Sequence, residues 1–133
     1  MFKRKKSGIN VTIVSSDTEI KGTLRSGSIL EIYGRVEVGR DELAVDTESF
    51  VRIAKPAKVF GGIRCKDLEV EGYVDGDVIC QGNVKLRKGC TVLGSIISAS
   101  LVIEDGVSFN GSVTMVVDQK EVETYDLGVD STQ

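Results

Sequence analysis

Apolar and polar residues alternate along most of the chain, and a glycine recurs between the apolar residues at fixed spacing. The unit apolar-x-Gly-x-apolar occurs eight times, whereas the composition predicts about two by chance. The eight units are Ile20-Gly22-Leu24, Ile32-Gly34-Val36, Val59-Gly61-Ile63, Val70-Gly72-Val74, Val74-Gly76-Val78, Cys80-Gly82-Val84, Val92-Gly94-Ile96 and Phe109-Gly111-Val113. Period-2 spacing places apolar residues on one face of an extended chain. The pattern therefore predicts short strands with glycines at the bends.

A longer unit of 13 residues contains this one. VRIAKPAKVFGGI (51–63), VKLRKGCTVLGSI (84–96) and LVIEDGVSFNGSV (101–113) align without gaps, and VTIVSSDTEIKGTL (11–24) aligns with one extra residue. A second unit, LEIYGRV (30–36) and LEVEGYV (68–74), fills the spaces between them. Successive units begin about 17–18 residues apart, which divides residues 11–115 into about six turns. A five-residue insertion near residues 39–48 predicts a surface loop.

These repeats predict an all-β fold, a single-stranded β-helix (β-solenoid) in which each turn stacks on the one before. Valine and isoleucine together number 30 against 8 leucines, a composition that favours strands. Their inward side chains would form one continuous column. A small sandwich of antiparallel hairpins is the competing fold. It requires turn pairs such as Asn-Gly at regular intervals, and the chain has a single Asn-Gly pair, Asn110-Gly111, in the middle of a repeat.

The composition argues against an enzyme. The chain has 133 residues, enough for one domain, and no histidine, which excludes Ser-His-Asp and Cys-His catalysis and three-histidine zinc sites. Cys65, Cys80 and Cys90 match neither a metal motif nor a disulfide framework, so we expect a reducing, cytoplasmic setting. Cys80 and Cys90 fit core positions, and Cys65 is expected to be partly exposed. Because the chain has no GxGxxG motif or P-loop, we expect no cofactor and no catalytic or metal site.

The two ends of the chain carry opposite charges. The first eight residues have four cations and no acid, and residues 116–133 have five acids and one lysine. We therefore divide the chain into a basic tail (1–8), a β-helix domain (9–115) and an acidic, disordered tail (116–133). A membrane contact is predicted for the residues Met1, Phe2, Lys3, Arg4, Lys5 and Lys6. Its partner would be an anionic bilayer surface rather than nucleic acid, because no basic stripe continues beyond Lys6.

The terminal turns of the predicted solenoid are as apolar as its interior turns. A stable monomer covers such ends with a polar turn or a helix, and the sequence shows neither. We therefore predict that the end turns pack on neighbouring copies, through the residues Val11, Ile13, Ile20, Leu24, Ile103, Val107, Phe109 and Val113. The alternative is that residues 117–133 fold back and cap the last turn with apolar side chains such as Val122 and Leu127.

The ordered series of short glycine-containing turns resembles the bactofilins, polymer-forming cytoskeletal proteins of bacteria. The resemblance covers about residues 9–115, and LVIEDGVSFNG and LEVEGYVDGDV are its most characteristic stretches. It implies a right-handed β-helix with flexible tails, nucleotide-free assembly into filaments, membrane association through a short N-terminal segment, and scaffolding of cell-wall or cell-shape machinery. MFKRKK matches that segment in kind. The insertion near residues 39–48 is longer than the turn usual in the family.

We expect a self-assembling scaffold, cytoplasmic and peripheral on the inner face of the cell membrane. Its partners would be other copies of the chain, the membrane and proteins of the cell wall or cell shape. One alternative is a monomeric β-solenoid that binds a partner protein through its flat faces, which predicts a single small species. An acyltransferase or carbonic anhydrase on a left-handed β-helix needs histidines that this chain lacks.

Overall fold

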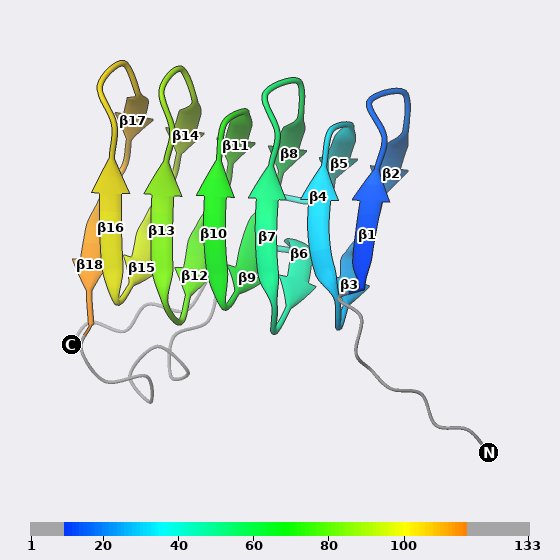
Figure 1. Ribbon diagram of the computed structural model, residues 1–133, viewed down its shortest axis with the longest axis horizontal. Helices are drawn as coiled ribbons and strands as arrows, with labels where there is room; N and C mark the ends of the chain where they lie inside the picture. The colour runs from blue at the N-terminus through cyan, green and yellow to red at the C-terminus, as the bar shows by residue number, and fades with distance from the viewer. Residues whose placement is uncertain (1–9, 117–133) are drawn as a thin grey trace.

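The computed structural model describes residues 10–116, and all regular structure within this range is β-strand. Eighteen strands form three sheets of six strands each, and the strands pair in parallel in all three. The chain visits the sheets in rotation, so one strand from each sheet makes one turn and six turns stack along the long axis (Figure 1). The prediction of a β-solenoid with about six turns is confirmed, and parallel pairing rules out the antiparallel sandwich.

Each sheet is named here by its place in this rotation. Sheet A contains β1 (Val11–Val14), β4 (Ile29–Ile32), β7 (Phe50–Ile53), β10 (Asp67–Val70), β13 (Asn83–Leu86) and β16 (Ser100–Ile103). Sheet B contains β2 (Glu19–Lys21), β5 (Arg35–Glu37), β8 (Lys58–Phe60), β11 (Tyr73–Asp75), β14 (Thr91–Leu93) and β17 (Ser108–Asn110). Sheet C contains β3 (Leu24–Ser26), β6 (Leu43–Thr47), β9 (Gly62–Cys65), β12 (Val78–Cys80), β15 (Ile96–Ser98) and β18 (Val113–Met115).

The core is a column of inward side chains that runs through all six turns. In sheet A, Leu30, Val51, Leu68 and Val84 lie on successive strands in register, and each is at most 2% exposed. Burying one such side chain contributes roughly 1.5–3 kcal/mol. Because the column continues from turn to turn, each interior turn is stabilised by the turn on either side of it.

The insertion lengthens one corner of the solenoid. Leu30 pairs with Val51, 21 positions later, whereas Val51 pairs with Leu68, 17 positions later. The extra residues lie in 38–42, between β5 and β6, where most turns have a shorter connection. Residues 39–42 are exposed as expected, but the expectation of a loop up to residue 48 is wrong. Residues 43–47 form β6, which keeps its register with β9 by means of one bulge beside Leu43.

Two corners between sheets A and B are so short that they require glycine. β10 and β11 are joined by Glu71 and Gly72 alone. A Cβ atom at Gly72 would collide with the carbonyl oxygens of Ala54 and Ala57 in the preceding turn. A Cβ atom at Gly34 would likewise collide with backbone carbonyl oxygens of the first turn. This close approach explains why LEIYGRV and LEVEGYV form a repeat type of their own, with glycine at the fifth position.

Candidate assembly surfaces

The two ends of the solenoid leave strand edges without a neighbour. β1, β2 and β3 lie at one end of the three sheets, and β16, β17 and β18 lie at the other (Figure 1). Within residues 10–116, each of these six strands pairs on one side only. Unpaired N–H and C=O groups on an edge strand are a template for pairing with another chain. Each end therefore presents three strand edges that a second copy could extend.

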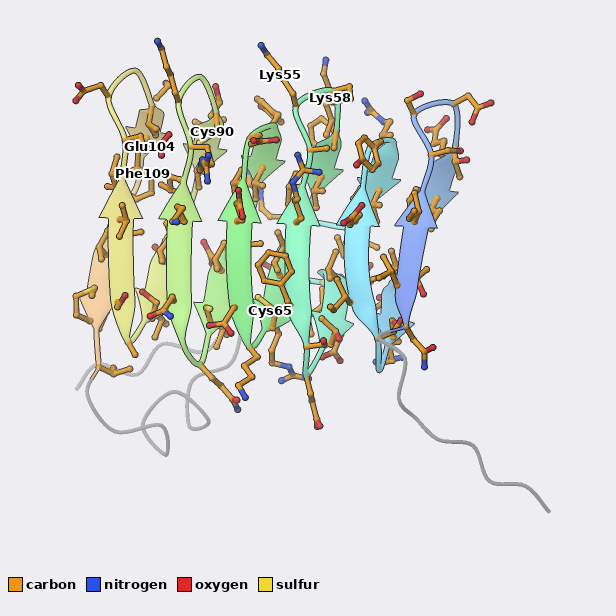
Figure 2. All side chains as sticks on the ribbon, viewed as in Figure 1. Lys55, Lys58, Cys65, Cys90, Glu104 and Phe109 are labelled. Carbon is orange, nitrogen blue, oxygen red and sulfur yellow. The ribbon has the colours of Figure 1, made fainter. Side chains whose placement is uncertain are left out.

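The inward side chains of the last turn form an open apolar surface. Ile103 pairs in register with Leu86, yet Ile103 is 48% exposed and Leu86 is fully buried. Phe109 lies opposite Val92 at the same end of sheet B and remains partly exposed (Figure 2). The C-terminal end face, as we call this surface, consists of Leu101, Ile103, Val107, Phe109, Val113 and Met115. All six side chains are apolar.

Two members of the C-terminal end face were missed in the sequence. Leu101 and Met115 each lie two positions from a predicted contact, Ile103 and Val113, and therefore on the same face of the strand. Met115 pairs with Ser98, which is fully buried. The period-2 rule that located the other members would have located these two as well.

The first turn has a different chemical character. Val14, Ile20 and Leu24 point inward as the apolar part of this end. Thr12 and Ser26 also occupy inward positions, because they pair with the buried residues Leu30 and Thr47. We call Thr12, Val14, Ile20, Leu24 and Ser26 the N-terminal end face. It has three apolar side chains between two hydroxyl side chains, whereas the C-terminal end face is apolar throughout.

The assignment of Val11 and Ile13 to the inward column is wrong. Ile13 pairs with Glu31, which faces outward, and Ile13 is 59% exposed. Val11 lies two positions before Ile13 on the same outer face. The repeat aligns without a gap from Thr12 onward, so the extra residue in the first unit is Val11. Starting the alignment at Val11 shifts the register by one residue. Such a shift exchanges the inward and outward residues of the strand. A role for these two side chains as polymer contacts stays a prediction, but it would involve the side of the solenoid.

The predicted membrane-contact residues, Met1, Phe2, Lys3, Arg4, Lys5 and Lys6, lie outside the described residues, as does the acidic segment 117–133. The predicted capping of the last turn by that segment is likewise outside them. Among residues 10–116, no helix is long and apolar enough to cross a membrane.

The three cysteines are core residues. Cys65, Cys80 and Cys90 are free thiols, each at most 2% exposed, so the expectation of a partly exposed Cys65 is wrong. Cys65 and Cys90 are labelled in Figure 2. A hydrogen bond with Cys80 and burial both raise the pKa of Cys65 well above its ordinary value, and burial raises the pKa of Cys90 to about 11. Both thiols therefore stay protonated and unreactive at neutral pH. Within 10–116, no three His, Cys, Asp or Glu residues are grouped to hold a metal ion.

A family model described as "Bactofilin: Polymer-forming cytoskeletal" matches residues 12–114. The chain is 28% identical to bactofilin BacO of Myxococcus xanthus over 120 residues, which cover 90% of each protein. It is 32% identical to bactofilin BacP of the same organism over 110 residues. That match covers 82% of this chain and 43% of BacP, so the chain spans less than half the length of this relative.

Among solved structures, the chain is similar to that of the cytoskeletal bactofilin BacA, determined by solid-state NMR. The TM-score is 0.63 at 22% sequence identity, and the match covers 80% of this chain and 96% of BacA. At this identity the likeness supports the β-solenoid fold and says nothing by itself about residue roles.

Proposed function

The chain belongs to the bactofilin family of polymer-forming cytoskeletal proteins, and from that premise we propose that its filaments grow by end-to-end packing of the terminal turns. The observation that carries this proposal is the C-terminal end face. Its side chains continue the core column in register, and Ile103 and Met115 are about half exposed only because no further turn covers them. A second copy placed at this end would extend the column and the three sheets.

The energy of such a contact comes from two sources. Burying a half-exposed aliphatic side chain contributes about 1 kcal/mol. Ile103, Val113 and Met115 are 38–50% exposed and the other three side chains are less exposed, so the C-terminal end face contributes roughly 3–5 kcal/mol. Association costs roughly 4–15 kcal/mol in lost freedom of movement. Apolar burial alone is therefore marginal, and hydrogen bonds along the three strand edges supply the rest. We accordingly expect growth of the filament to depend on protein concentration.

We further propose that assembly needs no nucleotide. The sequence has no phosphate-binding loop. The driving force described above is burial and strand pairing, neither of which requires nucleotide hydrolysis.

Membrane association is proposed to come from Met1–Lys6. Each cation near an anionic leaflet contributes about 1 kcal/mol, and an inserted Phe2 side chain contributes about 2 kcal/mol more. The sum of about 6 kcal/mol gives a single copy only a weak hold on the bilayer. Many copies in one filament bind together by avidity. The filament would then lie on the inner face of the cell membrane and organise cell-wall or cell-shape proteins there.

The test of this function is negative-stain electron microscopy of the full chain at about micromolar concentration, with no nucleotide or metal added. Thin filaments are expected. Uniform small particles over the whole concentration range would overturn end-to-end assembly and favour a monomeric β-solenoid that binds a partner protein. Sedimentation of the filaments with anionic vesicles, compared with neutral vesicles, tests the membrane contact separately.

A further inference from the structure

The insertion at residues 38–42 borders a groove that end-to-end assembly does not use. The groove lies along the corner between sheets B and C, and its volume of about 350 Å³ falls within the range of ligand pockets, roughly 300–1,000 Å³. Three parts of the chain line it: the insertion, the last residues of β5, β8, β11 and β14, and the corner residues that follow those strands. The insertion, which the fold does not require, thus helps to form a pocket.

Glycines leave the corner of this groove free of side chains. Gly61, Gly76 and Gly94 follow directly after β8, β11 and β14 and lie on successive turns. A Cβ atom at Gly76 would collide with the carbonyl oxygen of Gly61, and one at Gly94 would collide with that of Gly76. Because the corner has room for backbone alone, a trough remains beside the outward side chains of sheet B.

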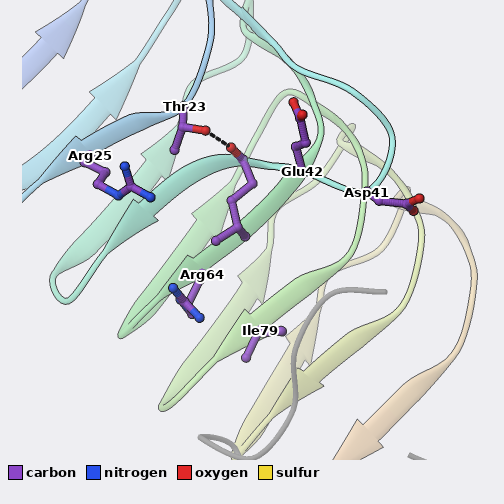
Figure 3. A pocket seen from close by; sticks show the side chains of 7 residues that line it. Thr23, Arg25, Asp41, Glu42, Arg64 and Ile79 are labelled. Atoms are coloured by element: carbon purple, nitrogen blue, oxygen red, sulfur yellow. Dashed lines mark hydrogen bonds between the residues drawn. The ribbon is translucent and has the colours of Figure 1, made fainter. Parts of the chain in front are cut away.

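The insertion is a fixed turn at the edge of this trough. The N–H of Val38 donates to the carbonyl oxygen of Phe60 (2.9 Å). The Glu42 carboxylate accepts a hydrogen bond from the N–H of Gly39 (3.1 Å), and the N–H of Glu42 donates to the Gly39 carbonyl oxygen (3.1 Å). Figure 3 shows the two acidic side chains of the insertion, Asp41 and Glu42, pointing in different directions. Glu42 therefore holds the turn, and a ligand need not order it.

Apolar side chains contribute to the lining from sheet B. Phe60 and Leu93 belong to one outward row of this sheet, and Asp75 lies between them in register. All three are partly exposed. Glu37 precedes Phe60 in the same row, but Arg35 pairs with its carboxylate (3.2 Å) and neutralises it. The row therefore offers two apolar side chains with an acidic side chain between them.

The remaining charges of the groove are mostly negative. Within residues 10–116, Asp41, Asp75 and Asp77 form no ion pair, although Asp77 accepts a hydrogen bond from the backbone N–H of Ser95 (2.9 Å). Arg40 is the only cation among the described residues that line the groove. Three carboxylates against one guanidinium leave a net charge of −2 once the neutralised Glu37 is set aside.

We propose that this groove binds an extended basic peptide of a partner protein, in which one bulky apolar side chain is flanked by lysine or arginine. The apolar side chain packs on Phe60 and Leu93, and the cations lie against Asp41, Asp75 and Asp77. In the part of the chain from 10 to 116, no three acidic residues are grouped to hold a metal ion. The separated carboxylates therefore suit separate cationic side chains better than one inorganic ion.

The groove lies on the side of the solenoid, so binding there leaves both end faces open. It does not depend on end-to-end assembly, which would only repeat the same groove once per subunit along a filament. A partner with several basic segments would then bind a filament by avidity. The insertion would set which partner is recruited.

The test measures the binding of two fluorescent peptides to the full chain by fluorescence anisotropy. Lys-Arg-Leu-Arg-Lys is the probe, and Lys-Arg-Ser-Arg-Lys is the control peptide, with the same charge and no bulky apolar side chain. We expect the leucine peptide to bind at least about fivefold more tightly, because its apolar side chain leaves water.

Charge variants locate the binding in the groove. Asp41→Asn combined with Asp75→Asn should weaken binding of the leucine peptide by about fivefold or more. Glu48→Gln combined with Asp105→Asn is the matched control, since it removes two exposed carboxylates from other corners, and it should change the affinity by about twofold at most. Circular dichroism checks that each variant keeps its β-structure.

A second pair of variants should act in the opposite direction. Arg40→Gln removes the cation of the groove and should strengthen binding of the leucine peptide by about twofold or more. Lys55→Gln, at an exposed position between β7 and β8, removes the same charge elsewhere and should have less effect. A weaker or unchanged affinity of Arg40→Gln would contradict a cationic ligand beside the insertion.

Three results would overturn the proposal. Equal affinity for the two peptides would remove the apolar contact. Equal weakening by the groove pair and the control pair would mean a general attraction to an acidic protein. Binding only after Lys3, Arg4, Lys5 and Lys6 are replaced with alanine would mean that the protein's own basic segment fills the groove. Electron microscopy scores filaments separately, so a failure of end-to-end assembly is distinguished from a failure of peptide binding.

Discussion

Ile103 and Leu86 occupy the same inward position on neighbouring strands of sheet A, but Ile103 is 48% exposed and Leu86 is fully buried. The two side chains differ in surroundings because Leu86 has a turn on both sides and Ile103 has a turn on one side only. A further turn in register would bury Ile103 as it buries Leu86. The end of the solenoid is thus an interior surface left open, which is the physical basis for the proposed end-to-end growth.

Phe109→Arg is expected to abolish filaments. Phe109 continues the inward row of Val92 at the C-terminal end face, so an arginine there would place a charge in the contact at a cost of several kcal/mol. Ser108→Arg is the matched control, because Ser108 is exposed and faces outward on the same strand. Electron microscopy and sedimentation should show small species for Phe109→Arg and filaments for Ser108→Arg. Filaments in both variants would remove Phe109 from the contact.

The register at the first turn predicts opposite effects for adjacent residues. Val14→Lys places a charge at an inward position that is 5% exposed and should lower the free energy of unfolding by roughly 3 kcal/mol or more. Ile13→Lys alters a side chain that is 59% exposed and should change the free energy of unfolding by about 0.5 kcal/mol or less. Urea unfolding followed by circular dichroism measures both. Comparable losses in the two variants would contradict the pairing of Ile13 with Glu31.

Much of the architecture could be predicted from the sequence because the repeat itself carries the geometry. Valine and isoleucine at period 2, with glycine at corners such as Gly72, indicate strands, bends and stacking in one pattern. The position of β6 could not be predicted, since a length difference between repeats locates an insertion only approximately. The inward set of the first turn was wrong because the Val-x-Ile match of Val11 and Ile13 to other repeats was preferred to the gap-free alignment that begins at Thr12.

The outer faces were predicted least well. The apolar repeat specifies what points inward, and it contains no information about what covers an outward residue such as Ile79. The contact between Ile79 and Val116 joins positions 37 residues apart in the sequence, without any shared motif. Such contacts are visible only once the turns are stacked in space.

Gly72→Ala is expected to destabilise the solenoid. The added methyl group would meet the carbonyl oxygens of Ala54 and Ala57, which are backbone atoms and cannot rotate away. We expect a loss of roughly 2 kcal/mol or more in the free energy of unfolding. Gly27→Ala is the control, since nothing lies within 4 Å of a Cβ atom at that position. Urea midpoints should fall clearly for Gly72→Ala and stay within error for Gly27→Ala, and a normal midpoint for Gly72→Ala would contradict the close corner.

Asp46→Asn should reduce the loss of stability in acid. Hydrogen bonds from Arg64 hold the pKa of Asp46 below its ordinary value of 3.8 in the folded state, against the opposing effect of burial. A lowered folded-state pKa contributes stability that is present above pH 3.8 and is lost as the pH falls through the folded-state value. The native chain should therefore lose more unfolding free energy than Asp46→Asn between about pH 5 and about pH 2. Equal losses in urea titrations at the two pH values would mean that the arginines do not stabilise the charged form.

Removing the first cations should release the protein from anionic bilayers without affecting filaments. Replacing Lys3, Arg4, Lys5 and Lys6 with alanine removes about 4 kcal/mol of attraction for each copy. Avidity turns a small attraction per copy into stable binding of the whole filament. Loss of the attraction from the four cations should therefore change cosedimentation with anionic vesicles from nearly complete to nearly absent. Phe2→Ala should weaken binding less, because it removes about 2 kcal/mol and leaves the cations in place. Electron microscopy serves as the control for assembly. If the variant without cations still sediments with anionic but not with neutral vesicles, the membrane contact must lie on the solenoid instead.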